Sequence, residues 1–184
     1  MVRLFTGLIF VPCLALPLYA QAQAAQDFER LFVRALELQQ AGDVLGAIDT
    51  YKAALTILPD RADALSNLGA AYVRLGQYDD AIKHYDAALK SDPMSHTVRL
   101  NLALAYYKSA RPQLAIPQLK RVLASDPEAR NAYLVLADCY LQTGQDQEVV
   151  SLLQPREQMF GNDPGYAYVL GTALLHLDNV GRST

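Results

Sequence analysis

The residue types best suited to catalysis or metal binding are sparse in this chain of 184 residues, which contains three histidines and two cysteines. His84, His96 and His176 are far apart and have no acidic or thiol partner at metal-ligand spacing, so no metal site is expected. We expect His84 on a solvated helix face. Cys139 has no neighbouring histidine that could activate it as a nucleophile, and it is predicted to be a buried apolar residue.

Other signs of enzyme chemistry are missing from the sequence as well. No glycine-rich phosphate-binding loop occurs, and Asp79, Asp80 and Asp92 have the positions of helix-terminal residues, not of a catalytic carboxylate pair. The formal net charge of −3, with scattered lysines and arginines, disfavours nucleic-acid binding, which needs a clustered basic face. We therefore expect no enzymatic activity, no cofactor and no nucleic-acid partner.

Two asparagines have a spacing that is compatible with binding a polypeptide. Asn67 and Asn101 are 34 residues apart, and each side-chain amide can both donate and accept a hydrogen bond. They could therefore bond the backbone of a bound peptide. The alternative is that both asparagines only bond neighbouring helices of this chain.

The first residues have the composition of an export signal. Arg3 precedes an apolar run from Leu4 to Ala20, and small residues then alternate with glutamine. We predict a signal peptide over residues 1–24, cleaved after Ala22 or Ala24, so that the mature protein is periplasmic or secreted and has no membrane span. The alternative is an uncleaved segment that anchors the chain in the membrane.

Beyond this segment, four sets of residues recur every 34 positions, which predicts a repeat architecture. The sets are Pro59, Pro93 and Pro127; Ala47, Ala81 and Ala115; Leu38, Tyr72, Tyr106 and Tyr140; and Leu68, Leu102, Leu136 and Leu170.

Each repeat has the pattern of two helices, as the unit over 62–95 illustrates. Leu68 and Tyr72 share one face of a first helix, which Gly76 is expected to end in a left-handed conformation. A second helix carries Tyr85 on its apolar face, and Pro93 closes the unit. One pair cannot bury its apolar face alone, so successive pairs must stack.

These residues resemble the tetratricopeptide repeat (TPR) family. The matching positions in 62–95 are Leu65, Leu68, Gly69, Tyr72, Gly76, Ala81, Tyr85, Ala88 and Pro93. The resemblance implies an all-α fold, an α-α superhelix (right-handed solenoid) of TPR helix pairs, and a non-catalytic role in protein binding.

The resemblance also implies a division into repeats, some of which depart from the family pattern. The predicted repeats are 28–61, 62–95, 96–129, a degenerate fourth at 130–163, and a partial fifth repeat or capping helix at 164–184. Ala110 replaces the glycine in the third repeat. Pro117 is expected to kink its second helix, and Pro155 to interrupt that of the fourth.

In this family the first helices line an inner, concave wall along which peptides or helices bind. The positions off the packing stripe of these helices are predicted to form that wall, and several are apolar. They are Ser66, Asn67, Ala70, Arg74, Leu100, Asn101, Leu104, Tyr107, Lys108, Leu134, Asp138, Leu141 and Gln142. The alternative is that the apolar wall packs against a further domain. The basic residues with which some family members clamp a terminal carboxylate are missing from the equivalent positions.

The function predicted from the sequence is a protein-protein interaction module in the bacterial cell envelope, which binds a peptide or helix along its concave surface. The alternative is the N-terminal recognition region of a longer envelope enzyme, or a component of a secretion or polysaccharide-export assembly.

Overall fold

The computed structural model describes residues 15–183, and the regular structure in this range is entirely helical. The chain divides into two compact units, Met1–Pro59 and Asp60–Thr184, which are described separately. The first 14 residues of the predicted signal peptide lie outside the described range.

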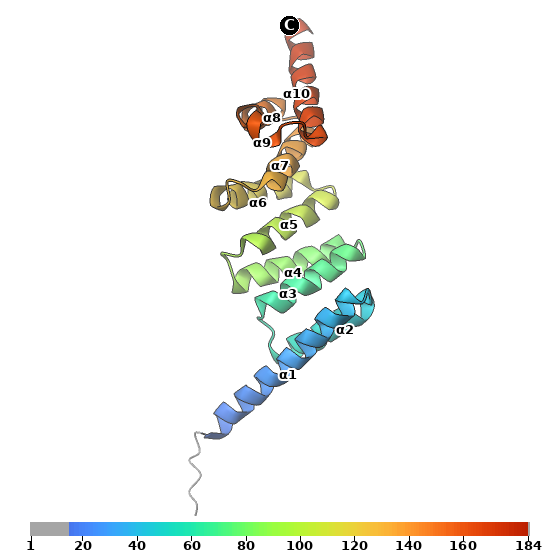
Figure 1. Cartoon of the computed structure of the whole chain (residues 1–184), viewed down its shortest axis with the longest axis vertical. Helices are drawn as coiled ribbons and strands as arrows, with labels where there is room; N and C mark the ends of the chain where they lie inside the picture. Colours follow the sequence, from blue (N-terminus) through green and yellow to red (C-terminus); the bar gives the residue numbers. More distant parts are fainter. Residues whose placement is uncertain (1–14, 184) are drawn as a thin grey trace, which may run out of the picture. The chain divides into compact units, whose positions relative to one another are not determined.

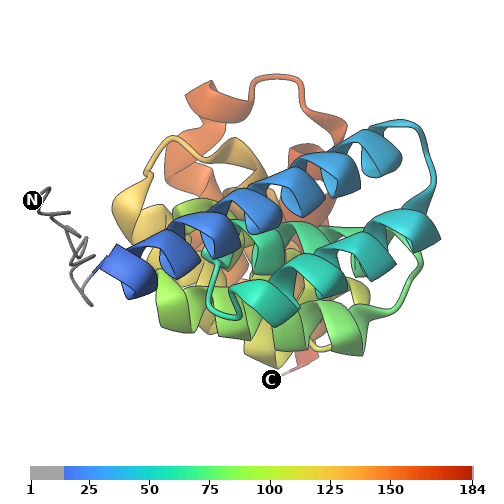
Figure 2. The ribbon, with the colours of Figure 1, turned by 90° about the horizontal axis from the view of Figure 1, so that it is seen from below.

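The first unit is a pair of packed helices, α1 (Ala15–Gln40) and α2 (Val44–Ile57), seen side by side in Figure 2. Phe28, Tyr51 and Ala54 form a core without solvent exposure, and the Tyr51 hydroxyl donates a hydrogen bond of 3.1 Å to Gln39 Oε1. Residues 18–23, at the start of α1, are exposed. The helix begins inside the predicted signal peptide, but its buried contacts begin only after that segment.

The second unit is a series of helices that pack on their neighbours in chain order (Figure 1). The helices are α3 (Ala62–Arg74), α4 (Tyr78–Ser91), α5 (His96–Lys108), α6 (Pro112–Ser125), α7 (Arg130–Gln142), α8 (Asp146–Leu153), a 3₁₀ turn η1 (Gln154–Arg156), α9 (Glu157–Phe160) and α10 (Pro164–Ser183). Each first helix packs on its own second helix, which in turn packs on the first helix of the next pair. The predicted all-α fold of helix pairs is confirmed.

The first helices end in the same hydrogen-bonded turn, which reverses the chain into the second helix. Gly76 has φ 71°, its N–H donates to the Val73 carbonyl at 3.0 Å, and the next N–H donates to Tyr72 at 3.0 Å. This is a Schellman motif, for which a left-handed residue is required. The third repeat forms the same turn with Ala110 at φ 57°, so the backbone keeps its path although the glycine is missing.

The small residues of the repeat allow two helices to come close together. A Cβ atom at Gly69 would lie 2.8 Å from Cε1 of Tyr85, which is 2% exposed. On the same interface the rings of Tyr72 and His84 stack at a centroid distance of 5.2 Å. The expectation of a solvated His84 is therefore wrong, because the flat imidazole is half-buried against the tyrosine.

The two prolines within second helices have different effects. Helix α6 continues through Pro117 without a break. The carbonyl of Gln113, which Pro117 cannot bond, belongs to an exposed residue, so water can satisfy it. At Pro155 the second helix is interrupted, as predicted: α8 ends at Leu153 and the chain continues as a 3₁₀ turn and the short α9.

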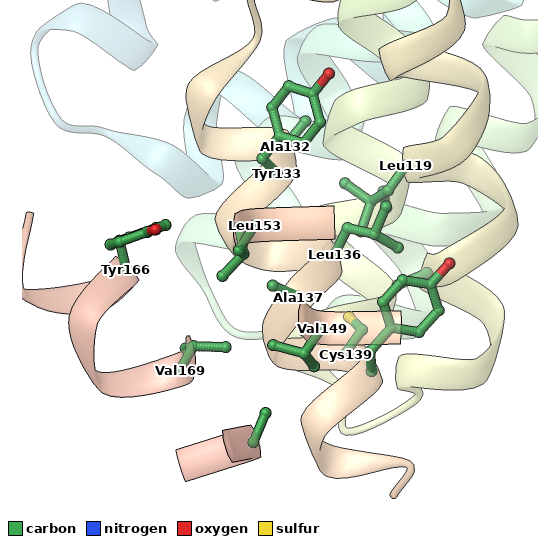
Figure 3. Packing of buried hydrophobic residues seen from close by; sticks show 14 of the residues in the cluster. Leu119, Ala132, Tyr133, Leu136, Ala137, Cys139, Val149, Leu153, Tyr166 and Val169 are labelled. Carbon is green, nitrogen blue, oxygen red and sulfur yellow. The ribbon is translucent and has the colours of Figure 1, made fainter. Parts of the chain in front are cut away.

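A cluster of buried side chains holds α7, α8 and α10 together (Figure 3). Phe160 packs edge-on against Tyr133 and is stacked on Tyr166 at 5.2 Å. Cys139 is fully buried in this cluster, as predicted. Burial, and secondarily the charge of Asp138, raises the pKa of its thiol to about 12, so the residue acts as an apolar side chain.

Candidate functional site

The thirteen residues predicted to line a binding wall lie on α3, α5 and α7, and none of them is fully buried. The exposed members are Arg74, Lys108 and Gln142, and the other ten are half-buried. This distribution follows from the helical repeat, because the fully buried positions of α3, α5 and α7 are taken up by contacts with neighbouring helices.

A groove of about 240 Å³ brings four of these residues together between α3 and α5. Ala70 lies on the α3 side, and Asn101, Leu104 and Lys108 lie on the α5 side. The lining is completed by Val73, Tyr85 and Ala105. Ala70, Val73 and Leu104 give the groove an apolar lining, and Asn101 and Lys108 add an amide and a positive charge.

Val73 lines the groove but was missing from the sequence prediction. It precedes Tyr107 and Leu141 by one and two repeat lengths, and both of those residues were predicted. The 34-residue period would therefore have identified Val73 if it had been applied to every position of the wall.

A second cluster of predicted residues lies where α5 meets α7. The Tyr107 hydroxyl donates a hydrogen bond of 2.5 Å to Asp138 Oδ2, and Gln142 Nε2 donates to the same oxygen at 2.7 Å. The bond to Asp138, with burial and the carboxylate charge, raises the pKa of Tyr107 to about 12. Among the described residues, none donates a hydrogen bond to the other carboxylate oxygen of Asp138. That oxygen can accept an N–H group from a ligand.

The two asparagines have different surroundings. Asn67 donates its amide to the Asp63 carbonyl of its own helix at 2.9 Å. Asn101 lines the groove, and within the part of the chain that the structure describes its side chain has no hydrogen-bond partner. Asn101 is therefore the better placed of the two to bond a peptide backbone.

The four leucines of the predicted wall are all half-buried. Leu100, Leu134 and Leu141 pack partly against the buried cluster of Figure 3, and Leu104 lines the groove. They give the surface an apolar character while part of each side chain is used for packing.

The structure contains few features of other kinds of site. In residues 15–183, no group of three or more histidine, cysteine, aspartate or glutamate side chains is arranged to hold a metal ion. His176 has a single acidic neighbour, Asp146, at 3.0 Å. A helix with the length and apolar character needed to cross a membrane does not occur among the described residues.

Comparison with solved structures identifies proteins with the same fold. A structure of MamA superposes with a TM-score of 0.76 at 23% identity, covering 81% of each chain. YrrB, described as a TPR protein with an unusual peptide-binding site, gives a TM-score of 0.76 at 20% identity over 87% of this chain and 84% of its own. MamA from Desulfovibrio magneticus RS-1 gives 0.76 at 21% identity, over 82% and 85%. No curated protein sequence shows significant similarity to this chain.

Sequence models of one family match most of the helix pairs. A tetratricopeptide repeat model matches residues 62–95, a second one matches 100–148, and a TPR repeat model matches 35–76. The matched segments include the residues that form the left-handed turn at Gly76 and the close contact at Gly69. The chain belongs to the tetratricopeptide repeat family.

Proposed function

We propose that this chain is a non-catalytic interaction module that binds a peptide or helix of a partner protein along the face formed by α3, α5 and α7. The observation that carries the proposal is the groove between α3 and α5, in which an apolar lining is combined with the unpartnered amide of Asn101. Peptide recognition needs both elements: apolar contact supplies binding free energy, and an amide fixes the backbone by hydrogen bonds.

The groove favours a particular kind of peptide. An apolar side chain of moderate size would contact Ala70, Val73 and Leu104. Lys108, exposed at the edge, favours an acidic residue next to it, and Asn101 bonds the backbone between the two. Further along the face, Asp138 would accept an N–H group through its free oxygen. YrrB is described as having a peptide-binding site, which supports a peptide ligand for this fold.

A location in the bacterial cell envelope is proposed from the N-terminal sequence. Cleavage after Ala22 or Ala24 is compatible with the first unit, because Phe28 is the first fully buried side chain among residues 18–40, the part of α1 whose side chains the structure describes. An uncleaved segment that anchors the chain is the alternative. Mass spectrometry of the N-terminus, after expression with its own leader, separates the two: a new terminus at residue 23 or 25 supports cleavage, and an intact Met1 supports the anchor.

A second proposal places the same binding face in the recognition region of a longer envelope enzyme, or of a secretion or polysaccharide-export component. The observation that favours it is that α10 packs on α7 and α8 as the first helix of a repeat does, while Leu174 on α10 is 46% exposed. Reading the gene beyond residue 184 would test it: a catalytic domain or further repeats in frame would support it.

Selection of a phage-displayed random peptide library on the full chain tests the groove. Selected peptides should bind Leu104→Glu at least about tenfold more weakly than the unaltered chain, since burial of a leucine contributes about 1.5–3 kcal/mol. Leu114→Glu is the matched control, because Leu114 is a 49% exposed leucine on α6, outside the groove. Equal binding by the two variants, with helical content unchanged, would refute the groove as the binding site.

A further inference from the structure

A basic pocket lies between α5 and α6, at the loop that joins α4 to α5. It has a volume of about 240 Å³, and none of the described residues that line it is acidic. A second depression of about 420 Å³ adjoins it, because Pro93, Arg99 and Arg121 line both. The helices that form the two depressions, α4, α5 and α6, pack on one another in this order (Figure 1). We call the two depressions together the arginine site, and it shares no lining residue with the groove between α3 and α5.

The two arginines of this site keep an uncompensated positive charge. Arg99 is half-buried, and its guanidinium donates hydrogen bonds to the Pro93 carbonyl at 2.5 Å and to Gln118 Oε1 at 3.2 Å. Both acceptors are neutral, so they fix the position of the guanidinium without balancing its charge. Arg121 is exposed, and its guanidinium has no hydrogen-bond or ion-pair partner in the part of the chain that the structure describes. Two such guanidinium groups suit a carboxylate, which accepts two parallel N–H groups.

The acidic residues near the arginine site do not neutralise it. Asp86 lines the larger depression one turn before Lys90. Burial raises the pKa of Asp86 overall, against the opposing effect of the Lys90 charge. Asp92 and Asp126 line neither depression, and each accepts a backbone N–H of its own loop, at 3.2 and 3.1 Å. Among the described residues, the site therefore has three cationic side chains and one carboxylate, in a chain whose net charge is −3.

The packing of the repeat does not require a charge at these positions. Arg99 has the position of Leu65 in the preceding repeat and of Tyr133 in the following one, which are 7% and 5% exposed. The position of Arg121 is uncharged in both of those repeats. A long cationic side chain has therefore replaced an apolar packing residue at Arg99, while the helix pair keeps its arrangement.

The loop of the arginine site differs from its equivalents in the opposite sense. Met94 lines the smaller depression and is 74% exposed. Its equivalents one repeat before and after are Asp60 and Glu128. The acidic residue that the other two loops carry at this position is thus missing from the loop that lies beside the two arginines.

We propose that the arginine site binds an acidic segment of a partner protein, with one carboxylate in the smaller depression between Arg99 and Arg121. Two adjoining depressions fit consecutive residues of a polypeptide, whereas a single small anion would occupy only one of them. Pro93 and Met94 would contact the methylene groups of a glutamate side chain, and Leu89 lines the neighbouring depression for the next residue. The proposal is independent of the function proposed for the groove, since the two sites have no lining residue in common.

Binding of a fluorescein-labelled hexaglutamate peptide to the full chain tests this proposal. We expect saturable binding in fluorescence anisotropy at low ionic strength, and none of a hexalysine peptide. Arg121→Glu should weaken the binding at least about tenfold, because a charge-assisted hydrogen bond is lost and a like charge is introduced. Lys83→Glu is the matched control, since Lys83 is an exposed lysine of α4 that lines neither depression and the change in net charge is the same. It should bind as the unaltered chain does.

Two further variants separate the arginine site from the fold and from the groove. Arg99→Leu introduces the residue type that packs at the same position of α3, so helical content should be unchanged while peptide binding weakens at least about tenfold. Lys108→Glu alters the cation of the groove between α3 and α5 and should leave this binding unchanged. Binding that is lost with Lys108→Glu and retained with Arg121→Glu would place the acidic peptide in the groove and overturn the proposal.

The remaining outcomes are equally decisive. Equal binding by Arg121→Glu and Lys83→Glu would show that the peptide responds only to net charge, and it would overturn the proposal, as would the absence of any peptide binding. Vesicles of phosphatidylglycerol address a different occupant. If the unaltered chain binds the vesicles and not the peptide, and Arg121→Glu abolishes vesicle binding, the site recognises a lipid headgroup and the acidic-segment proposal is wrong.

Discussion

Replacing Ala110 by glycine is expected to stabilise the chain. Ala110 is the left-handed residue at the end of α5, with φ 57°, and its N–H donates to the Tyr107 carbonyl at 3.0 Å. Gly76 has the equivalent position at the end of α3, with φ 71° and the same hydrogen-bond pattern. The two turns therefore differ mainly in whether the left-handed residue carries a Cβ atom.

The magnitude follows from two opposing terms. A left-handed conformation costs an L-residue about 1–2 kcal/mol, which Ala110→Gly removes. Glycine loses more conformational freedom on folding, which costs roughly 0.5–1 kcal/mol. Ala110 is exposed, so the loss of its methyl group sacrifices little burial. The net expectation is a stabilisation of about 0.5–1 kcal/mol, or a rise of roughly 1–4 °C in Tm for a chain of this size.

Urea denaturation followed by circular dichroism measures this difference, and hydrogen exchange of α5 and α6 shows whether it arises at the turn. The reverse substitution, Gly76→Ala, is the matched control. A Cβ atom at Gly76 would meet nothing within 4 Å, so a loss of about 0.5–1 kcal/mol there reports the backbone alone. If Ala110→Gly is neutral or destabilising while Gly76→Ala destabilises, the reasoning is refuted.

Three further outcomes are expected. The Cys139 thiol, whose pKa burial raises to about 12, should react with a disulfide reagent at pH 8 only after unfolding; rapid reaction of the folded chain would contradict its burial. Gly69→Ala should destabilise by about 1–3 kcal/mol in urea denaturation, because the new Cβ would lie 2.8 Å from Tyr85; a neutral effect would show that the ring can move. Burial raises the pKa of Asp63, but hydrogen bonds from Arg61 and a backbone N–H and the Arg61 charge lower it overall. Asp63→Asn should therefore reduce Tm at pH 7, by an amount that shrinks as the pH falls through the lowered folded-state pKa, because below it the carboxylate is protonated in both states; a Tm difference that does not shrink as the pH is lowered would contradict this origin.

The helix pairs could be predicted from the sequence because their packing positions repeat. Leu68, Leu102 and Leu136 are each 1% exposed, so three positions one repeat length apart have the same surroundings. A residue type that is required at the same place in every interface recurs at a fixed spacing in the sequence. The fold can therefore be predicted from that spacing. Helix ends can be predicted for the same reason, since Gly76 has the left-handed conformation that ends α3.

The surface could be predicted only in outline, because the partner of a polar side chain depends on its rotamer and not on its spacing. Asn67 and Asn101 have equivalent positions, yet Asn67 bonds its own helix and Asn101 faces the groove. The exposure of His84 was predicted wrongly for a related reason: the helical pattern puts it beside the packing stripe, and only the structure shows that it stacks on Tyr72.

Under the proposed function, the same comparison indicates where the specificity of the module would lie. One register position of the proposed binding face is occupied in turn by Ala70, Leu104 and Asp138, which are small, apolar and acidic. The packing position two residues before each of them is leucine in all three repeats. Packing restricts this position to leucine, because it has the same surroundings in each interface, whereas the face is free to differ from repeat to repeat. A ligand that lies across α3, α5 and α7 therefore meets a different chemical group at each helix, and this order, more than any single residue, would determine which polypeptide the module accepts.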